Sequence, residues 1–507
     1  MRTMRAYGWA SVALIGGYLL AGIGHRAFDV VQWHDWQRLL QLALLPALAL
    51  PLVFLPALQS RASAVLAWLG AAAPALVLLA LSLGAVSAAT SGFARQGSLE
   101  CAVFALLGAT TLAVAVARSA LGLRFDAAML IVFSATAAAL ALSFTVAYAA
   151  ALFSDAGFAV VQLYNFGFSN PRFLGQFQTL VLPLLAAACV APSIAPRYRS
   201  AAFVVLALTW VLAMVSMTRA IWPAFAIGMA AGFVLCPRGA LRIAVAQVAA
   251  IAVAFPLSTL LLEVIPPLLG HDPGRFFADA AARLADSGSI AARGELWARA
   301  LELTALHPWL GVGPMGLALD AGATAAHPHN AALQIAAEWG IPAALAAAAA
   351  AVILGVRTLQ ASNLGQRGAA DPVALALPIA LAAAAAHSMI DGVIVMPYTQ
   401  VAAVVLAGWA IGMAFAESRC DRDDASRVAG ASAGAIALLA TIVVFVAVRP
   451  DLGVVNDREQ RLLRACPACT NLGTRFWTYG VIIGEVSGAT RMPLPAGLAP
   501  GAATDSR

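Results

Sequence analysis

A His-Pro-His-Asn sequence directly before an apolar segment is the clearest candidate for acid–base chemistry. His327 and His329 flank Pro328, and Asn330 precedes the run Ala331-Ala-Leu. Proline and asparagine favour helix starts, and the positive end of a helix dipole keeps a nearby imidazole neutral, as a general base requires. Ordinary interfacial loop histidines are the alternative. No carboxylate lies beside the pair in the sequence, so no metal site is predicted.

Two groups of arginines are candidates for binding an anion. Arg219 joins two apolar segments without a polar loop. An arginine at a helix centre costs about 2.5–3.5 kcal/mol on insertion scales, which favours a partner anion. Arg293 and Arg299 lie in an amphipathic segment, and guanidinium groups bind phosphate oxygens bidentately. Snorkelling of Arg219 to the interface and a solvated Glu295–Arg299 pair are the alternatives.

Three further motifs carry polar or thiol groups. His387 and Asp391 lie at the edge of an apolar segment, where they either orient a base or belong to an ordinary helix end. Cys466 and Cys469 form a Cys-Pro-Ala-Cys motif near the carboxyl terminus, which predicts a disulfide in an oxidising compartment. A thiol redox motif is the alternative.

These candidate residues belong to a chain whose composition predicts a membrane protein. Of its 507 residues, 62% are hydrophobic and 11% are charged, too few polar groups to cover a water-soluble globule. We expect an all-α polytopic fold with about 12–13 transmembrane helices, because a crossing needs about 20 apolar residues. The thirteen predicted spans are 7–24, 39–58, 63–87, 101–117, 127–152, 173–193, 200–218, 220–236, 243–262, 330–354, 372–389, 394–416 and 431–448.

Arginine distribution gives the orientation. Most arginines between spans fall in alternate loops, so these loops are predicted to be cytoplasmic. The predicted organisation is an amino-terminal membrane region (1–262), a periplasmic loop (263–329), a carboxyl-terminal membrane region (330–448) and a periplasmic tail (449–507). All 30 basic residues are arginine, which excludes lysine nucleophiles, Schiff bases and phosphate-loop lysines. Without a basic stripe with interleaved aromatics, no nucleic-acid partner is predicted.

The order and spacing of the motifs resemble the O-antigen ligase superfamily, which includes O-antigen ligases, O-antigen polymerases and bacterial O-oligosaccharyltransferases. The resemblance covers about Ser216 to Pro342 and extends less strongly to the segments around Asn170 and His387. The motifs that carry it are Thr218-Arg219, Arg293…Trp297, His307-Pro308…Gly311-Val-Gly313-Pro314, His327-Pro-His329-Asn330 and Glu338-Trp-Gly340-Ile-Pro342. The thirteenth span and the long tail depart from the usual twelve helices of the family.

The resemblance implies an inverting glycosyltransferase of the GT-C type that uses no metal or other cofactor. It implies an undecaprenyl-pyrophosphate-linked glycan donor and an active site at the periplasmic face of the inner membrane. His329 would be the base, and Arg219 and Arg293 would bind the pyrophosphate. The residues expected to support the site are Arg172, His327, Asn330, Glu338 and Asp391.

The acceptor is left open by these residues. The function expected first is that of an O-antigen ligase, which transfers the glycan to lipid A–core. The alternatives are a protein O-oligosaccharyltransferase with a pilin acceptor and a polymerase with a growing glycan as acceptor. Arg475-Phe-Trp477 in the tail is predicted to pack on the outer surface near the acceptor entrance. A flippase or transporter is the alternative from another class, although its polar residues would be expected nearer the membrane midplane.

Overall fold

The computed structural model describes residues 2–24, 32–153, 167–271, 278, 281–282, 288–320, 325–369, 371–418, 426–452 and 474–477. Within these ranges, all elements of regular structure are helices. The amino-terminal helices are α1 (Arg2–Ala21), α2 (Trp33–Ala49), α3 (Pro51–Phe54), α4 (Pro56–Leu69), α5 (Ala72–Thr90), α6 (Ala94–Leu121), α7 (Leu123–Leu152), α8 (Pro171–Val190), α9 (Pro196–Val215), α10 (Ile221–Leu235) and α11 (Pro237–Thr259).

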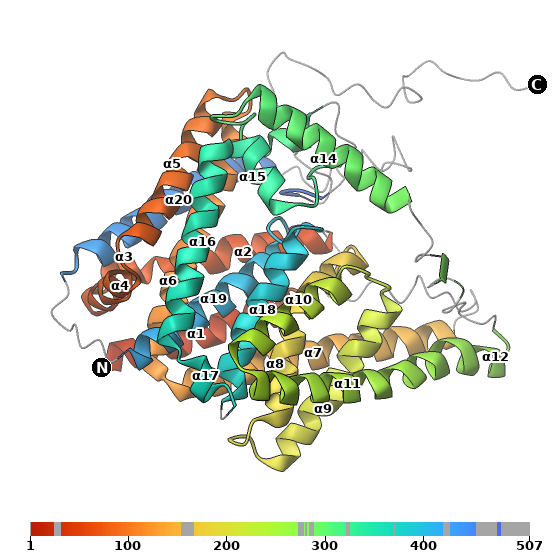
Figure 1. Ribbon diagram of the computed structural model, residues 1–507. Helices are drawn as coiled ribbons and strands as arrows, with labels where there is room; N and C mark the ends of the chain where they lie inside the picture. Colours follow the sequence, from red (N-terminus) through yellow and green to blue (C-terminus); the bar gives the residue numbers. More distant parts are fainter. Residues whose placement is uncertain are drawn as a thin grey trace, which may run out of the picture.

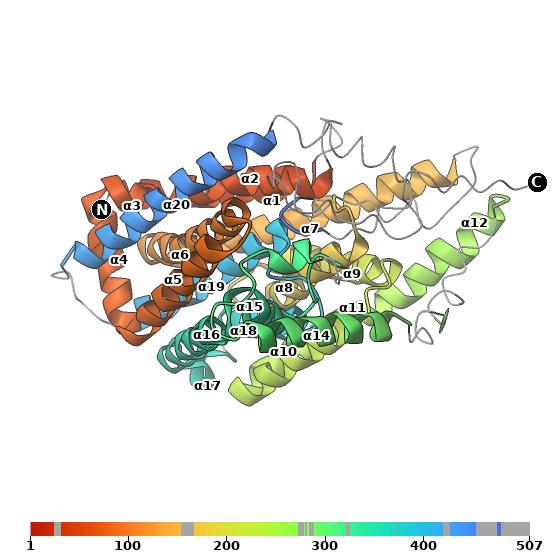
Figure 2. The same ribbon diagram turned by 90° about the horizontal axis from the view of Figure 1, so that it is seen from above.

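The π-helical turn η3 (Leu260–Val264) continues α11 into α12 (Ile265–Leu268). The later elements are α14 (Gly288–Leu306), the 3-10 turn η4 (Gly316–Leu319), α15 (Ala331–Trp339), α16 (Ile341–Ala361), α17 (Leu364–Arg367), α18 (Pro372–Ser388), α19 (Pro397–Glu417) and α20 (Val428–Leu452). Figures 1 and 2 show α12 at one end of the molecule and α4 at the other.

The helices have the length and surface of membrane spans. Ten helical segments among the described residues are long and apolar enough to cross a bilayer, and α10 and α18 are shorter apolar helices. Large apolar side chains are exposed on the outside of the bundle, such as Val234 (84%) and Val248 (65%). Such exposure is unfavourable in water but expected against lipid. The predicted all-α polytopic membrane fold is confirmed.

Three of the predicted spans were wrong in continuity. The span 39–58 is broken at Leu55, between α3 and α4, and the other two are broken at a glycine. The span 63–87 is interrupted at Gly70, between α4 and α5, and the span 330–354 is interrupted at Gly340, between α15 and α16. Both glycines have positive φ, at 82° and 89°, a conformation that ends a helix and that residues with a Cβ atom rarely adopt. Hydropathy alone does not detect such breaks, because apolar residues continue on both sides.

Local sequence signals explain many helix starts. Pro171 and Pro372 lie at the first positions of α8 and α18, where a missing N–H costs no helical hydrogen bond. Asn170 caps α8 and Asn330 caps α15, each through a side-chain oxygen that accepts from a backbone N–H. The predicted helix start at Asn330 therefore exists, although α15 ends after Trp339.

The elements that hold the candidate site pack on one another. Helix α18 packs against both α8 and α10, and α6 packs against α19 and α20. Helix α14 packs against α15, and Figure 1 shows it lying across the outside of the bundle beside α15 and the start of α16. Residues 325–330 thereby lie close to residues 389–396, which come later in the chain.

Candidate active site

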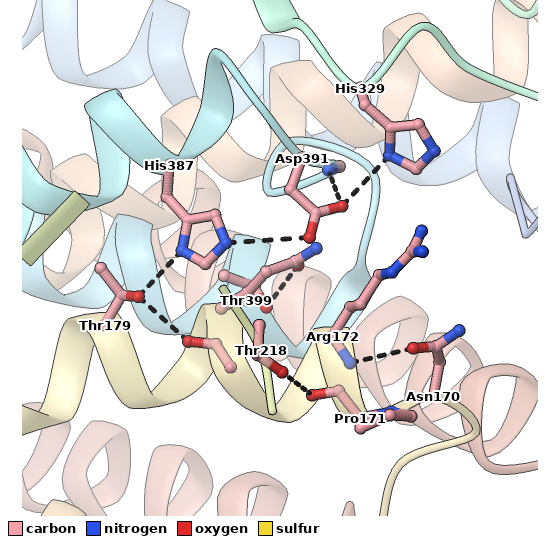
Figure 3. A network of polar contacts seen from close by, with 12 residues as sticks. Asn170, Pro171, Arg172, Thr179, Thr218, His329, His387, Asp391 and Thr399 are labelled. Atoms are coloured by element: carbon pink, nitrogen blue, oxygen red, sulfur yellow. Dashed lines mark hydrogen bonds and ion pairs between the residues drawn. The ribbon is translucent and has the colours of Figure 1, made fainter. Parts of the chain in front are cut away.

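His329 is hydrogen-bonded to a buried carboxylate. Its Nδ1 lies 3.1 Å from Oδ1 of Asp391, which is in the loop between α18 and α19 (Figure 3). The Asp391 side chain is 2% exposed, whereas that of His329 is 16% exposed. A carboxylate at Nδ1 favours the tautomer that carries its proton there, which leaves a lone pair on Nε2. The accessible ring therefore has the arrangement of an oriented general base.

A second histidine holds the other side of Asp391. His387, at the end of α18, places Nε2 at 3.7 Å from Oδ2 of Asp391, and its Nδ1 lies 2.8 Å from the hydroxyl of Thr179 in α8. The backbone N–H of Gly392 also donates to Oδ1 of Asp391, at 2.8 Å. These contacts fix the carboxylate between two membrane helices and the His329 loop, as Figure 3 shows.

Electrostatics keep Asp391 charged and His327 neutral. Burial alone would raise the pKa of the Asp391 carboxyl, but the contacts from His329 and His387 hold that pKa well below its usual value. Burial lowers the pKa of His327 well below its usual value, and the nearby charges of His329 and Arg475 lower it further. The neutral His327 accepts a 3.3 Å hydrogen bond from the backbone N–H of His329 and thereby supports the loop.

Arg293 faces the histidine loop from α14. Trp297, one turn later on the same helix, donates from its indole to the backbone oxygen of Pro328 at 2.9 Å. Residues four positions apart share a helix face, so Arg293 lies on the face that meets this loop. Burial lowers the pKa of the Arg293 guanidinium, Asp391 opposes that shift, and the charges of Arg172 and Arg219 add to it.

Arg172 and Arg219 reach the same region from neighbouring segments. Thr218 donates to the backbone oxygen of Pro171 at 3.3 Å, so the turn that holds Arg219 packs against the start of α8, which holds Arg172. In Figure 3 the Arg172 side chain extends toward the space beside His329 and Asp391. Arg293 lies within electrostatic range of Asp391, Arg172 and Arg219, so three guanidinium groups from three parts of the chain gather near the His329–Asp391 pair, an arrangement suited to a phosphate or pyrophosphate group.

Asn330 ties the loop in place. Its side-chain oxygen accepts from the N–H of Leu333 at 3.0 Å, and its side-chain nitrogen donates to the backbone oxygen of Met389 at 3.1 Å. Asn330 therefore joins the start of α15 to the loop that carries Asp391.

Other predicted residues lie elsewhere. Glu338 is fully buried near the end of α15, where it pairs with Arg475 instead of facing His329. Arg299 does not pair with Glu295; it contacts Asp320 and Glu302. Arg475, Phe476 and Trp477 are buried, so the prediction that they pack on the outer surface was wrong. The predicted disulfide cysteines, Cys466 and Cys469, lie outside the described residues.

The sequence interpretation missed three polar residues that pack around these elements: Arg38, Glu100 and Thr179. Arg38 and Glu100 had a detectable signal, since charged residues within apolar segments usually mark a buried partner. Thr179 lies in an apolar segment without any sequence signal, and only its contact with His387 distinguishes it. Among the described residues, no group of three or more metal-ligating side chains comes together.

The structure thus combines a multi-pass helical membrane fold with an oriented histidine near three arginines. Residues 202–348 match the family model described as O-antigen ligase, so this part of the chain is similar to the O-antigen ligase superfamily, as the motifs predicted. The matched segment holds Arg219, Arg293 and His329, whereas Asp391 and Arg475 lie beyond it. No curated protein matches the sequence significantly.

This match supports a glycosyltransferase type of function that acts on lipid-linked glycans in a membrane.

Proposed function

We propose that this protein transfers a glycan from an undecaprenyl-pyrophosphate carrier to an acceptor hydroxyl at the periplasmic face of the inner membrane, most specifically O-antigen to lipid A–core. The observation that carries the proposal is the His329–Asp391 hydrogen bond, which leaves Nε2 of an accessible imidazole free beside three arginines. The oriented imidazole fits a base and the cations fit a pyrophosphate.

In the proposed reaction, Nε2 of His329 takes the proton of the acceptor hydroxyl while the hydroxyl oxygen attacks the anomeric carbon of the donor. The bond from that carbon to the phosphate oxygen breaks, and its electron pair leaves with undecaprenyl pyrophosphate. Arg219 and Arg293, with Arg172 beside them, stabilise the charge that develops on the leaving group. Attack opposite the leaving group inverts the anomeric centre, and no metal takes part.

Asp391 supports this reaction through His329. The carboxylate holds the tautomer that exposes the Nε2 lone pair, and it stabilises the imidazolium that forms after proton transfer. A positioned base contributes typically about 10²–10⁴-fold to a rate.

The test is glycan transfer in proteoliposomes that contain the purified chain and an undecaprenyl-pyrophosphate-linked glycan. Lipid A–core, pilin and free lipid-linked glycan are offered in parallel. We expect product on lipid A–core, and a loss of about 10²–10⁴-fold in His329→Ala with donor binding retained. His307→Ala is the matched control, because His307 is an exposed histidine at the end of α14.

Transfer to pilin or to another glycan would replace the ligase assignment with a protein oligosaccharyltransferase or a polymerase. Unchanged transfer in His329→Ala would overturn the proposed base. Movement of the lipid-linked glycan across the bilayer without any transfer would favour a flippase.

A further inference from the structure

Residues 474–477 of the tail lie in the interior of the protein, 22 positions after the end of α20 at Leu452. Residues 474–477 are described after a gap that begins at 453, and within them Arg475 is 1%, Phe476 4% and Trp477 2% exposed. Burying an arginine is unfavourable unless its charge and donors are satisfied. The contacts of Arg475 therefore decide what this segment does.

Arg475 joins two helices through two carboxylates. Its Nη2 lies 2.7 and 3.0 Å from the carboxylate oxygens of Glu100 in α6, and 2.5 Å from Oε2 of Glu338 in α15. With its amide oxygen turned toward Arg475, Gln334 of α15 accepts from both terminal guanidinium nitrogens, at 2.9 and 2.7 Å. One side chain of the tail thus holds α15 at two positions, one helical turn apart, and connects it to α6.

The backbone of the same segment is held by α2. Arg38 donates from Nε to the backbone oxygen of Phe476 at 3.1 Å, and its guanidinium lies 4.7 Å from the centre of the Phe476 ring. Nε2 of His34 is 3.1 Å from the same backbone oxygen. These contacts fix the tail segment independently of α15, so it provides a firm point against which α15 is held.

Trp477 fixes the other end of the segment. Its indole N–H donates to Oδ2 of Asp451 at the end of α20, at 3.0 Å, and Asp451 in turn pairs with Arg95 of α6 at the same distance. The segment therefore contacts α2, α6, α15 and α20, three of which belong to the membrane bundle.

Helix α15 connects the segment held by Arg475 to the candidate base. His329 and the capping residue Asn330 directly precede α15, while Glu338 lies in its last turn. Nine residues of α-helix span only about 14 Å and move as one unit. A shift of the Glu338 end therefore displaces or tilts the His329 end, and His329 must meet Asp391 from a different part of the chain.

We propose that Arg475 is a positioning residue of the transfer site: the tail segment Thr474–Trp477 inserts into the bundle and holds α15 so that His329 meets Asp391. The catalytic part of this proposal rests on the proposed function. Arg475 itself touches neither base nor donor, so its effect is on the geometry of the base and on turnover, with donor binding by Arg219 and Arg293 left in place.

The experiment compares Arg475→Met, Arg475→Lys and the charge-neutral triple variant Glu100→Gln/Glu338→Gln/Arg475→Met in proteoliposomes. Arg449→Met, which removes an exposed arginine at the end of α20, is the matched control. Glycan transfer is measured per folded protein as kcat and donor KM, and hydrogen exchange is followed over residues 325–339.

In Arg475→Met we expect kcat to fall about 10²-fold, the loss typical of a misplacement near 1 Å, with little change in donor KM and faster exchange across 325–339. The triple variant leaves no unpaired charge and tests the case in which the single variant does not fold; it is expected to stay slow. Arg475→Lys is expected to recover part of the rate.

Full kcat in folded Arg475→Met or in the triple variant, or unchanged exchange across 325–339, would overturn the positioning role. The two readouts separate the proposals. If wild-type protein transfers no glycan, the proposed function fails, while the exchange measurement still tests whether Arg475 holds α15.

Discussion

Two polar clusters lie at opposite ends of α15, and they differ in exposure and in the residues that form them. At one end, His329 keeps an accessible nitrogen, contacts the carboxylate of Asp391 and stands near three arginines. At the other end, Arg475 is fully buried and its guanidinium contacts Glu100 and Glu338.

The His329 cluster therefore has the features of a binding site, whereas the charge of Arg475 already has its partners within the protein. A group of arginines favours an anionic ligand, and an accessible acceptor nitrogen can take a proton from a substrate. A buried arginine between two carboxylates offers nothing to a ligand, and its contribution is to hold elements together. Substitutions at the first end should therefore change chemistry, and those at the second should change stability and geometry.

Asp391→Asn should have the largest effect on chemistry. Without the carboxylate, the His329 tautomer with a free Nε2 is no longer favoured, and transfer is expected to fall by up to about 10⁴-fold with donor binding retained. The measurement is glycan transfer alongside a donor-binding assay. Asp371→Asn, the same change at the other end of α18, keeps a capping side chain and serves as control. Equal activity in both variants would contradict an orienting role for Asp391.

Arg475→Met should have the largest effect on stability. Removing this arginine leaves two buried carboxylates without their partner, which costs about 3–5 kcal/mol in the free energy of unfolding. The measurement is the thermal unfolding midpoint in detergent, where a clear decrease is expected. Adding Glu100→Gln and Glu338→Gln should restore much of the lost unfolding midpoint. A midpoint equal to wild type in the single variant would show that the buried cluster does not stabilise the fold.

Arg293→Ala should have an intermediate effect on donor use. Loss of a charged hydrogen-bonding partner costs about 1.5–3 kcal/mol, or roughly 10–10²-fold in kcat/KM for the donor. Arg299→Ala, six residues further along the same helix, breaks contacts to Asp320 and Glu302 and should leave transfer near wild type. Both variants are measured in one kinetic assay. Equal losses of kcat/KM in the two variants would contradict the placement of the donor beside Arg293.

Asn330→Ala should have the smallest effect. It removes the cap of α15 and the contact to Met389, with an expected cost of about 1 kcal/mol in unfolding free energy. Asn330→Asp keeps the cap but loses the donor to Met389, so transfer rates in the two variants separate helix capping from loop docking. If Asn330→Asp is as slow as Asn330→Ala, the Met389 contact is the more important one; if neither is slowed, Asn330 does not position the base.

Much of the fold was predictable because hydropathy and turn chemistry are local. Apolar segments of about 20 residues must be helical in a bilayer, since no water satisfies their backbone groups. Pro328 and Asn330 predicted a helix start that the structure contains, since α15 begins at Ala331. The breaks at Gly70 and Gly340 were missed because a hydropathy window averages over a single residue with unusual φ.

The sequence predicted which residues belong to the site, but not which of them contact one another. His329, Arg219 and Arg293 were chosen for their residue types and order, yet nothing in the sequence joins His329 to Asp391, 62 positions away. Glu338 was expected to support the site of His329 because the family resemblance includes the Glu338-Trp-Gly340 motif. The length of α15 separates them, and the partner of Glu338 comes from the tail.

The sequence by itself determined a helical membrane protein with a histidine at a helix start and arginines within apolar surroundings, because composition and local propensity act over a few residues. Tertiary packing alone decided which carboxylate orients the histidine and where the tail goes. Asp391, Glu100 and Arg475 are buried charges, and a buried charge is tolerated only where a partner from elsewhere in the chain meets it; that meeting depends on how the helices pack.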